Sequence, residues 1–179
     1  MASELHVDTI KHSGGTTALT IDSSGRVLTP ARPAFKARRA GASNQSLGGG
    51  SDTQTLIMNV VDFDIGGGYN TSTGIYTVPK TGIYFFFLNP RFDSMDASSY
   101  FRSLIYNGSS SGQATAYTDL GNVLTSINGD GHSSNYETRS VSGILQCTQG
   151  DTIRFLGGHN SDTSVTLQQE SQCGGFLVG

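Results

Sequence analysis

The densest apolar segment of the chain spans residues 83–88, where every side chain is large and apolar or aromatic. Flanking Gly, Pro and Thr residues favour a β-strand over a helix. Side chains of a strand alternate between its two faces, so Ile83, Phe85 and Phe87 should face one way and the residues between them the other. A half-buried strand would alternate apolar with polar residues. This strand is therefore predicted to be covered on both faces, by a domain core and by something else, such as a second subunit.

From residue 34 onward, strand-like segments recur between turns rich in Gly, Ser and Asn. The predicted strands are 34–39, 55–61, 74–78, 83–92, 100–106, 115–119, 123–127, 139–147, 152–156, 164–168 and 172–178. The predicted connectors are 48–52, 66–68, 107–112, 128–135, 149–150 and 157–162. Because no segment has the 3.6-residue apolar period of a capped amphipathic helix, the chain is predicted to be an all-β sandwich or jelly roll.

The first 30 residues differ in character from the rest. Three short alternating segments, 5–10, 18–22 and 26–28, are separated by the turn signals Gly14-Gly15 and Ser23-Ser24-Gly25. This pattern predicts a small β-meander or extended arm, 1–30, followed by a head domain, 31–179. Thirty residues cannot bury a core of their own, so the arm must pack on its own head, on its copies or on another protein.

Composition narrows the classes of function. Charged residues make up 14% of the chain, the net charge is −3, and the largest basic cluster is residues 36–39. A nucleic-acid-binding protein would carry a basic stripe or face, so nucleic acid is not an expected partner. No apolar run reaches the length of a membrane-spanning helix, so membrane insertion is not expected. The first residues lack the features of a signal peptide, so the protein is expected to be made in a cytoplasm. In that compartment Cys147 and Cys173 are expected to be free, buried thiols, with a disulfide as the alternative.

Eight residues follow a fixed spacing that closes on a Gly-x-Tyr-x-Phe motif: Met58, Asp64, Tyr69, Tyr76, Gly82, Tyr84, Phe86 and Leu88. This spacing resembles that of the complement C1q-like globular head, although Met58 and Tyr76 stand where phenylalanine is usual and Leu88 replaces a closing aromatic residue. Residues 145–153 resemble the family's Gly-Asp turn with its flanking strands, and 171–178 its last strand. The resemblance covers about 34–179. It implies a C1q/TNF-like jelly roll that assembles as a homotrimer for display or recognition, without catalysis.

Upstream of the head, residues 7–11 and 19–27 resemble the N-terminal segments of bacteriophage virion surface proteins. The two resemblances together imply a trimeric virion structural protein, a capsid decoration or cement protein, whose arm docks on other virion proteins such as the major capsid protein. The alternative is the receptor-binding tip of a tail or head fibre, with a host surface glycan or receptor as its partner. Either role places the protein on the virion surface.

These expectations assign residues to two sets. The core or trimer strand set is Tyr76, Ile83, Tyr84, Phe85, Phe86, Phe87, Leu88 and Phe176. The virion attachment set is Leu5, Val7, Ile10, Leu19, Ile21 and Val27.

Three groups of polar residues are candidate chemical sites. Residues 108–112 match a Gly-x-Ser-x-Gly nucleophile elbow around Ser110, with His132 and His159 downstream, but no helix is expected after the motif and both histidines are expected in polar loops. Residues 128–135 place oxygen donors at alternate positions but lack an EF-hand's spacing, so an ordinary turn is favoured, calcium is left open and no other cofactor is expected. Tyr100, Tyr117 and Tyr136 are candidates for a carbohydrate-binding face, against the alternative of tyrosines at a sheet rim.

Overall fold

The computed structural model describes residues 5–41, 44–48, 53–93, 100–108, 123–130, 136–160 and 164–179. The chain divides into two compact units, Met1–Arg32 and Pro33–Gly179, called here the N-terminal unit and the head. Every regular element in the described ranges is a β-strand, and all pairings are antiparallel, so the all-β prediction is confirmed. No helix in these ranges has the length and apolar character needed to span a membrane.

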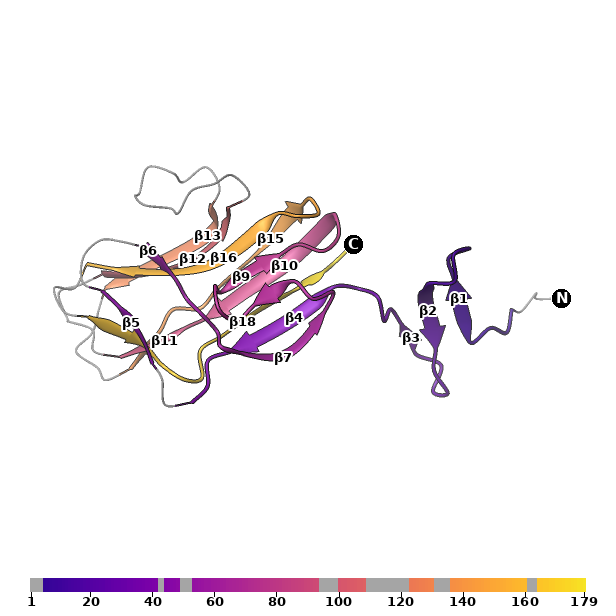
Figure 1. Ribbon diagram of the computed structural model, residues 1–179, viewed down its shortest axis with the longest axis horizontal. Coiled ribbons are helices and arrows are strands. Elements are labelled where there is room, and N and C mark those ends of the chain that lie inside the picture. The colour runs from indigo at the N-terminus through magenta and orange to yellow at the C-terminus, as the bar shows by residue number, and fades with distance from the viewer. Residues whose placement is uncertain are drawn as a thin grey trace. The chain divides into compact units, whose positions relative to one another are not determined.

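The first layer of the head is a five-stranded sheet (Figure 1). In spatial order its strands are β15 (Val141–Cys147), β10 (Gly82–Asn89), β18 (Gln172–Leu177), β4 (Ala34–Arg38) and β7 (Val60–Ile65). The strand predicted at 83–88 is thus β10, and it lies between β15 and β18.

Two adjacent glycines in β18 make room for the aromatic side chains of β10. Gly174 pairs with Phe87 and Gly175 with Phe86. A Cβ on Gly174 would lie 2.6 Å from the ring of Phe87, and a Cβ on Gly175 would lie 2.3 Å from the ring of Phe86. The glycines therefore let one phenylalanine ring lie over each face of β18.

The second layer is a six-stranded sheet. Its strands are β13 (Val123–Asp130), β12 (Tyr100–Asn107), β16 (Thr152–His159), β9 (Ile75–Thr77) and β8 (Tyr69–Asn70), with β6 (Thr53–Thr55) also paired to β16. A four-stranded sheet completes the head. It consists of β14 (Glu137–Thr138), β11 (Arg91–Asp93), β17 (Val165–Leu167) and β5 (Gln45–Leu47).

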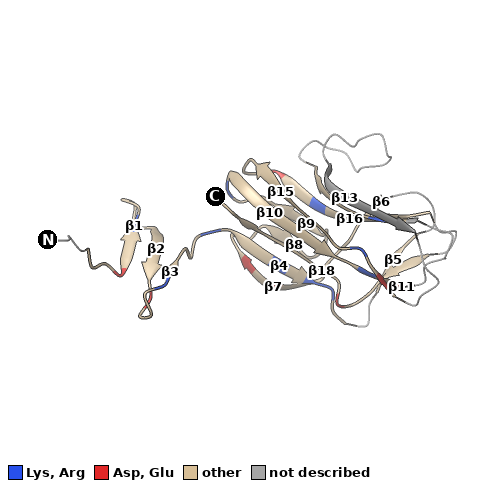
Figure 2. Cartoon of the chain, turned by 180° about the vertical axis from the view of Figure 1, so that it is seen from behind, with Lys and Arg blue, Asp and Glu red and all other residues tan. Residues whose placement is uncertain are grey.

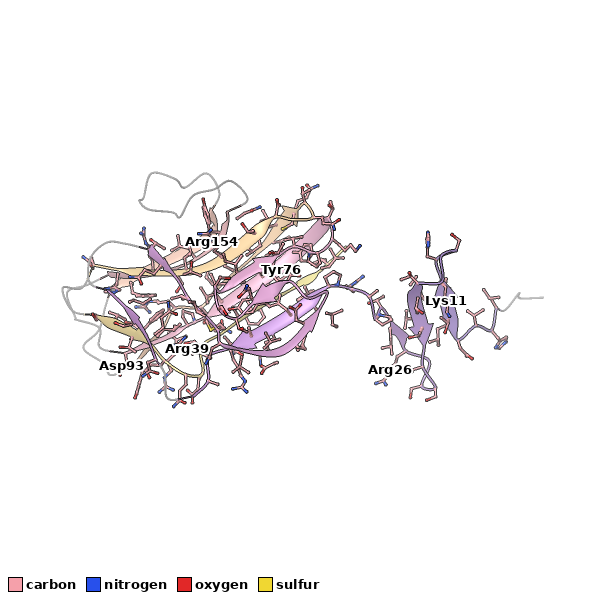
Figure 3. The ribbon with its side chains drawn as sticks, in the orientation of Figure 1. Lys11, Arg26, Arg39, Tyr76, Asp93 and Arg154 are labelled. Atoms are coloured by element: carbon pink, nitrogen blue, oxygen red, sulfur yellow. The ribbon has the colours of Figure 1, made fainter. Side chains whose placement is uncertain are left out.

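An aromatic cluster joins the two main layers. Phe35 and Phe86 come from the five-stranded sheet, Tyr76 and Phe155 from the six-stranded sheet, and all four are buried. The rings of Phe35 and Tyr76 are stacked with centroids 4.1 Å apart, and Phe86 meets Phe155 edge-on at 6.4 Å. Tyr76 lies at the middle of this packing (Figure 3). These contacts between layers make the head a sandwich with one aromatic core.

The N-terminal unit is a three-stranded meander of β1 (Thr9–Lys11), β2 (Thr17–Ile21) and β3 (Val27–Leu28). Asp22 closes the β2–β3 turn. Its Oδ1 accepts hydrogen bonds from the backbone N–H groups of Ser24 and Arg26, with N···O distances of 3.0 and 2.9 Å. Gly25 takes the positive φ of 76° that this turn requires.

Two predicted strands are each divided in the structure. The segment predicted as one strand at 83–92 forms two strands, β10 and β11. They are separated at Pro90, because proline has no N–H to donate to a neighbouring strand. The segment 55–61 is also wrong as one strand, since β6 ends at Thr55 and β7 begins at Val60. The backbone between them is held by side chains: the N–H of Ile57 donates to Gln45 Oε1 (2.8 Å) and that of Met58 to Tyr69 Oη (3.0 Å).

Two predicted connectors begin as strand. Gly157, Gly158 and His159 continue β16, so the expected connector at 157–162 is wrong in its first half. A Cβ on Gly157 would lie 2.9 Å from Leu56 and 3.3 Å from Phe101, which shows that this glycine serves close packing. Likewise Asn128–Asp130 of the expected turn at 128–135 belong to β13. The rest of that segment, and the strand predicted at 115–119, lie outside the described residues.

Candidate subunit interface

Strand β10 has two apolar faces, as its sequence predicted. Tyr84, Phe86 and Leu88 are fully buried in the core. Ile83, Phe85 and Phe87 alternate with them and lie on the opposite face of the five-stranded sheet, which we call the outer face. Ile83 is exposed, and the two phenylalanines are partly exposed.

The register of the sheet extends this outer face across all five strands. Phe85 is paired with Ile144 on one side and Phe176 on the other, Phe176 with Ala34, and Ala34 with Ile65. We call these five side chains the apolar row. Five strands spaced about 4.8 Å apart make it about 19 Å wide.

The apolar row is open to solvent in the single chain. Ile144 is 64% exposed and Phe176 44% exposed, and Ile65 is also exposed. The rings of Phe85 and Phe176 contact each other with centroids 5.5 Å apart, so the middle of the row is already packed within the sheet. An exposed apolar band of this width on a sheet face is typical of a surface that meets another molecule.

Beyond the apolar row, the outer face mixes apolar and polar side chains. The row on one side holds Ser142, Phe87, Gly174, Lys36 and Phe63, and the row after it Gln172 and Arg38. On the other side of the apolar row lies the exposed Ile83. Strands β10, β15 and β18 contain no charged residue, as the uncharged colour of these strands in Figure 2 shows.

Charge on this face is confined to the border with β7. Asp62 Oδ1 accepts from Arg38 Nε at 2.7 Å, and Asp62 Oδ2 lies 3.2 Å from Lys36 Nζ. The hydrogen bond from Arg38 is the main reason why the pKa of Asp62 is lowered. The face is therefore largely apolar, with its charges paired along the β7 edge.

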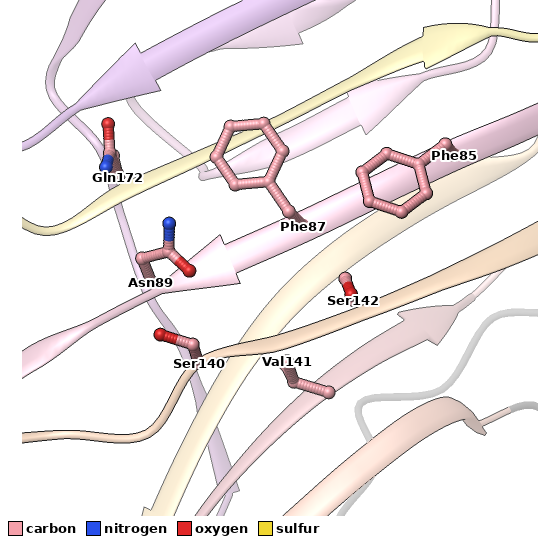
Figure 4. Close-up of a pocket in the computed structure, with 7 residues that line it drawn as sticks. All are labelled: Phe85, Phe87, Asn89, Ser140, Val141, Ser142 and Gln172. Atoms are coloured by element: carbon pink, nitrogen blue, oxygen red, sulfur yellow. The ribbon is translucent and has the colours of Figure 1, made fainter.

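A hollow of about 480 Å³ lies on the outer face beside the apolar row. Its lining combines the rings of Phe85 and Phe87 with amide and hydroxyl groups (Figure 4). The polar side chains are Asn89, Gln172, Ser140 and Ser142. Sequence reasoning missed all four, because it located the aromatic strand but gave no information on which polar residues its neighbours would bring beside it.

The structure divides the two predicted sets of residues. Of the strand set, Tyr76, Tyr84, Phe86 and Leu88 lie in the core, whereas Ile83, Phe85, Phe87 and Phe176 lie on the outer face. Of the attachment set, Ile10, Leu19, Ile21 and Val27 come together on the meander, and Leu5 precedes it and is 81% exposed. Val7 is partly exposed.

The described residues do not form the nucleophile or metal site that the polar motifs could have provided. Ser110 and His132 lie outside the described residues. His159 was expected in a polar loop, but it is buried in β16, where Nε2 lies 3.3 Å from the carbonyl oxygen of Leu47 and burial lowers the pKa of the ring. No three His, Cys, Asp or Glu residues in the described ranges are grouped as metal ligands.

The two cysteines are free and buried. Burial raises the pKa of Cys147 to about 12 and also raises that of Cys173. Among the candidate carbohydrate-binding tyrosines, Tyr136 is exposed, with the guanidinium of Arg91 4.0 Å from its ring centroid. Tyr117 and the side chain of Tyr100 lie outside the described residues.

The head is thus a jelly-roll sandwich that carries an exposed apolar sheet face. Residues 34–178 match the family model of the C1q domain, so the chain belongs to the C1q domain family. No curated protein sequence matches the chain.

Solved structures share the fold at low sequence identity. The globular domain of the zebrafish complement 1qA protein is 17% identical with a TM-score of 0.57, over 82% of this chain and 98% of that one. Murine APRIL at pH 5.0 is 15% identical with a TM-score of 0.59, over 82% and 99%. Eiger TNF from S. frugiperda is 12% identical with a TM-score of 0.59, over 83% and 94%. At these identities the likeness concerns the fold alone.

Proposed function

We propose that this chain is a homotrimeric, non-catalytic structural protein of a bacteriophage virion surface, a capsid decoration or cement protein made in the host cytoplasm. Its heads associate through the outer face, and its N-terminal unit attaches the trimer to other virion proteins. The observation that carries the assembly is the apolar row, which crosses every strand of the five-stranded sheet and is uncovered in the single chain.

A second and third copy of the head suit this surface. Interfaces between subunits combine apolar contacts with polar groups at their edge, and the outer face combines the apolar row with the paired charges of Lys36, Arg38 and Asp62 along its β7 edge. Closed cyclic symmetry gives every copy an equivalent environment and leaves no apolar row exposed. Three copies are proposed because the C1q-like resemblance implies a trimer.

Two neighbouring residues of β10 test the assembly. Phe85→Asp places a carboxylate on the outer face, so we expect a folded monomer in light scattering, with the β-sheet circular dichroism of the wild type. Phe86→Asp places the same group in the core, so we expect misfolded protein. A wild-type chain that remains monomeric at micromolar concentrations would refute the proposed trimer.

The virion role is supported by the resemblance of residues 7–11 and 19–27 to phage surface proteins and by the need of the small meander for a partner. Deleting residues 1–28 should leave a trimeric head that no longer binds purified virions. The head carries the whole aromatic core, so this deletion removes no core residue. Normal decoration by the truncated head would show that the arm is not the attachment device.

The alternative function is a receptor-binding tip of a tail or head fibre. Tyr136 is exposed, and the guanidinium of Arg91 lies over one face of its ring, 4.0 Å from the centroid. An exposed aromatic ring with a polar hydroxyl favours a recognition surface for a host glycan or receptor. Copy number in purified virions separates the two roles. A decoration protein would be present in hundreds of copies, and a fibre tip in a handful of trimers.

A further inference from the structure

The N-terminal meander has one apolar face. Ile10 is paired with Leu19, and Ile21 with Val27. Leu19 and Ile21 are two residues apart on β2, so all four side chains lie on the same face of the meander, which we call the meander face. On the opposite face, Thr20 is paired with both Thr9 and Leu28.

The meander face needs a cover that the three strands cannot supply. Val27 is 63% exposed and Ile10 is also exposed. Strands of three, five and two residues form a single layer, and a single small layer has no second element against which to bury its apolar side. The meander is therefore expected to be ordered only when another surface packs on this face.

We propose that the meander faces of the three chains pack against one another and close a three-sided β collar. This inference rests on the proposed trimer of heads. Residues 29–32 are all that separate β3 from the head, so assembled heads would hold three identical meanders at an effective concentration on the order of millimolar. A separate protein would have to displace these tethered copies.

The local charges are compatible with this packing. At the turn next to Val27, Arg26 Nε lies 2.7 Å from Asp22 Oδ2, so the cation and the carboxylate form a pair within each chain. The positions of Arg26 and of the other cation of the meander, Lys11, can be seen in Figure 3. Since Ile10, Leu19, Ile21 and Val27 are all aliphatic, three copies would meet through these side chains around a threefold axis.

The collar changes the assignment of the attachment residues. Ile10, Leu19, Ile21 and Val27 would be buried between sister chains and would not reach another protein. Leu5, which is 81% exposed, and Val7 would then carry the contact with the virion.

Neighbouring cysteines on β3 test the collar in the full chain. Val27→Cys lies on the meander face and Leu28→Cys on the opposite face, and the wild-type residues are 63% and 46% exposed. Cys147 and Cys173 are buried, so they should add no background under native oxidation. Mild oxidation followed by a non-reducing denaturing gel should show covalent dimers of Val27→Cys, with one disulfide per trimer. They should form at least about ten times faster than those of Leu28→Cys, because exchange follows the effective thiol concentration.

A measurement without mutation accompanies this experiment. The N–H of Ile21 donates to the carbonyl oxygen of Asp8 at 2.8 Å, and hydrogen exchange should show this amide protected in the isolated wild-type trimer. A trimer in which Val27→Cys and Leu28→Cys cross-link at equal rates would overturn the collar and leave the proposed function intact. Protection that appears only after purified virions are added would also overturn it, because the meander face would then be covered by another protein. A monomeric wild type would refute the trimer itself, and the collar with it.

Discussion

The apolar row makes a quantitative prediction at Ile144. This side chain is 64% exposed in the single chain and lies at the β15 end of the row. Fully burying an Ile side chain stabilises by about 1.5–3 kcal/mol, so burying its exposed two thirds would contribute about 1–2 kcal/mol per subunit. Because each of the three subunits of the proposed trimer carries the residue, replacing it should weaken that trimer by about 3–6 kcal/mol, which corresponds to roughly 10²–10⁴ in the dissociation constant.

Ile144→Asp should therefore be a folded monomer at concentrations where the wild type is a trimer, and the desolvation of three carboxylates would add to the loss. Sedimentation equilibrium measures the constant, and urea unfolding measures the stability of the head. Thr77→Asp is the matched control, since Thr77 is exposed on β9 of the other sheet. A surface substitution in a monomer changes stability by less than about 0.5 kcal/mol. If Ile144→Asp kept the wild-type trimer, the apolar row would not be the interface.

Three further predictions concern the head itself. Gly175→Ala should destabilise it by about 1–3 kcal/mol in urea unfolding, because its Cβ would lie 2.3 Å from the ring of Phe86, whereas Gly48→Ala, whose Cβ has only Gln54 at 3.7 Å, should be close to neutral. The stability of the head should fall as the pH drops below about 6.5, because burial lowers the pKa of His159 and the unfolded chain then binds the proton more readily; in His159→Gln this part of the pH dependence should disappear. A thiol reagent at pH 8 should label neither cysteine until the protein is unfolded, when it should label both, because both thiols are buried and the pKa of Cys147 is raised to about 12; rapid labelling of the native protein would contradict the buried positions.

The alternation along β10 was predictable because it is a local property of the chain. Successive side chains of any strand point to opposite faces, so the two-sided run at 83–88 fixed which residues share a face before any partner strand was known. The all-β class followed in the same way from short apolar segments between glycine-rich turns.

The apolar row was not predictable, because it depends on pairing between distant segments. Ala34 and Phe176 are paired neighbours in the sheet but lie at opposite ends of the head sequence. A shift of one residue in the register would place different side chains beside Phe85. The hollow beside Asn89 and Gln172 was missed for the same reason.

Short strands and packed glycines account for the remaining differences. Strands β5, β8 and β14 have two or three residues each, too few to show an alternating pattern. Gly157 was assigned to a turn because a glycine that permits a turn and one that permits close packing look alike in a sequence. The side chains of Leu56 and Phe101, brought close by the fold, distinguish them.

The glycine pair of β18 also acts as a check on strand register. If β18 slipped by one residue along β10, Cys173 or Phe176 would occupy a place that only a glycine can fill beneath one of the phenylalanine rings. The same slip would turn the side chain of Phe176 from the outer face towards the core. The dipeptide therefore disfavours a slip in either direction, and only the correct register places Phe176 on the outer face. Assembly through the outer face, as proposed, would thus depend on the correct register of β18 against β10.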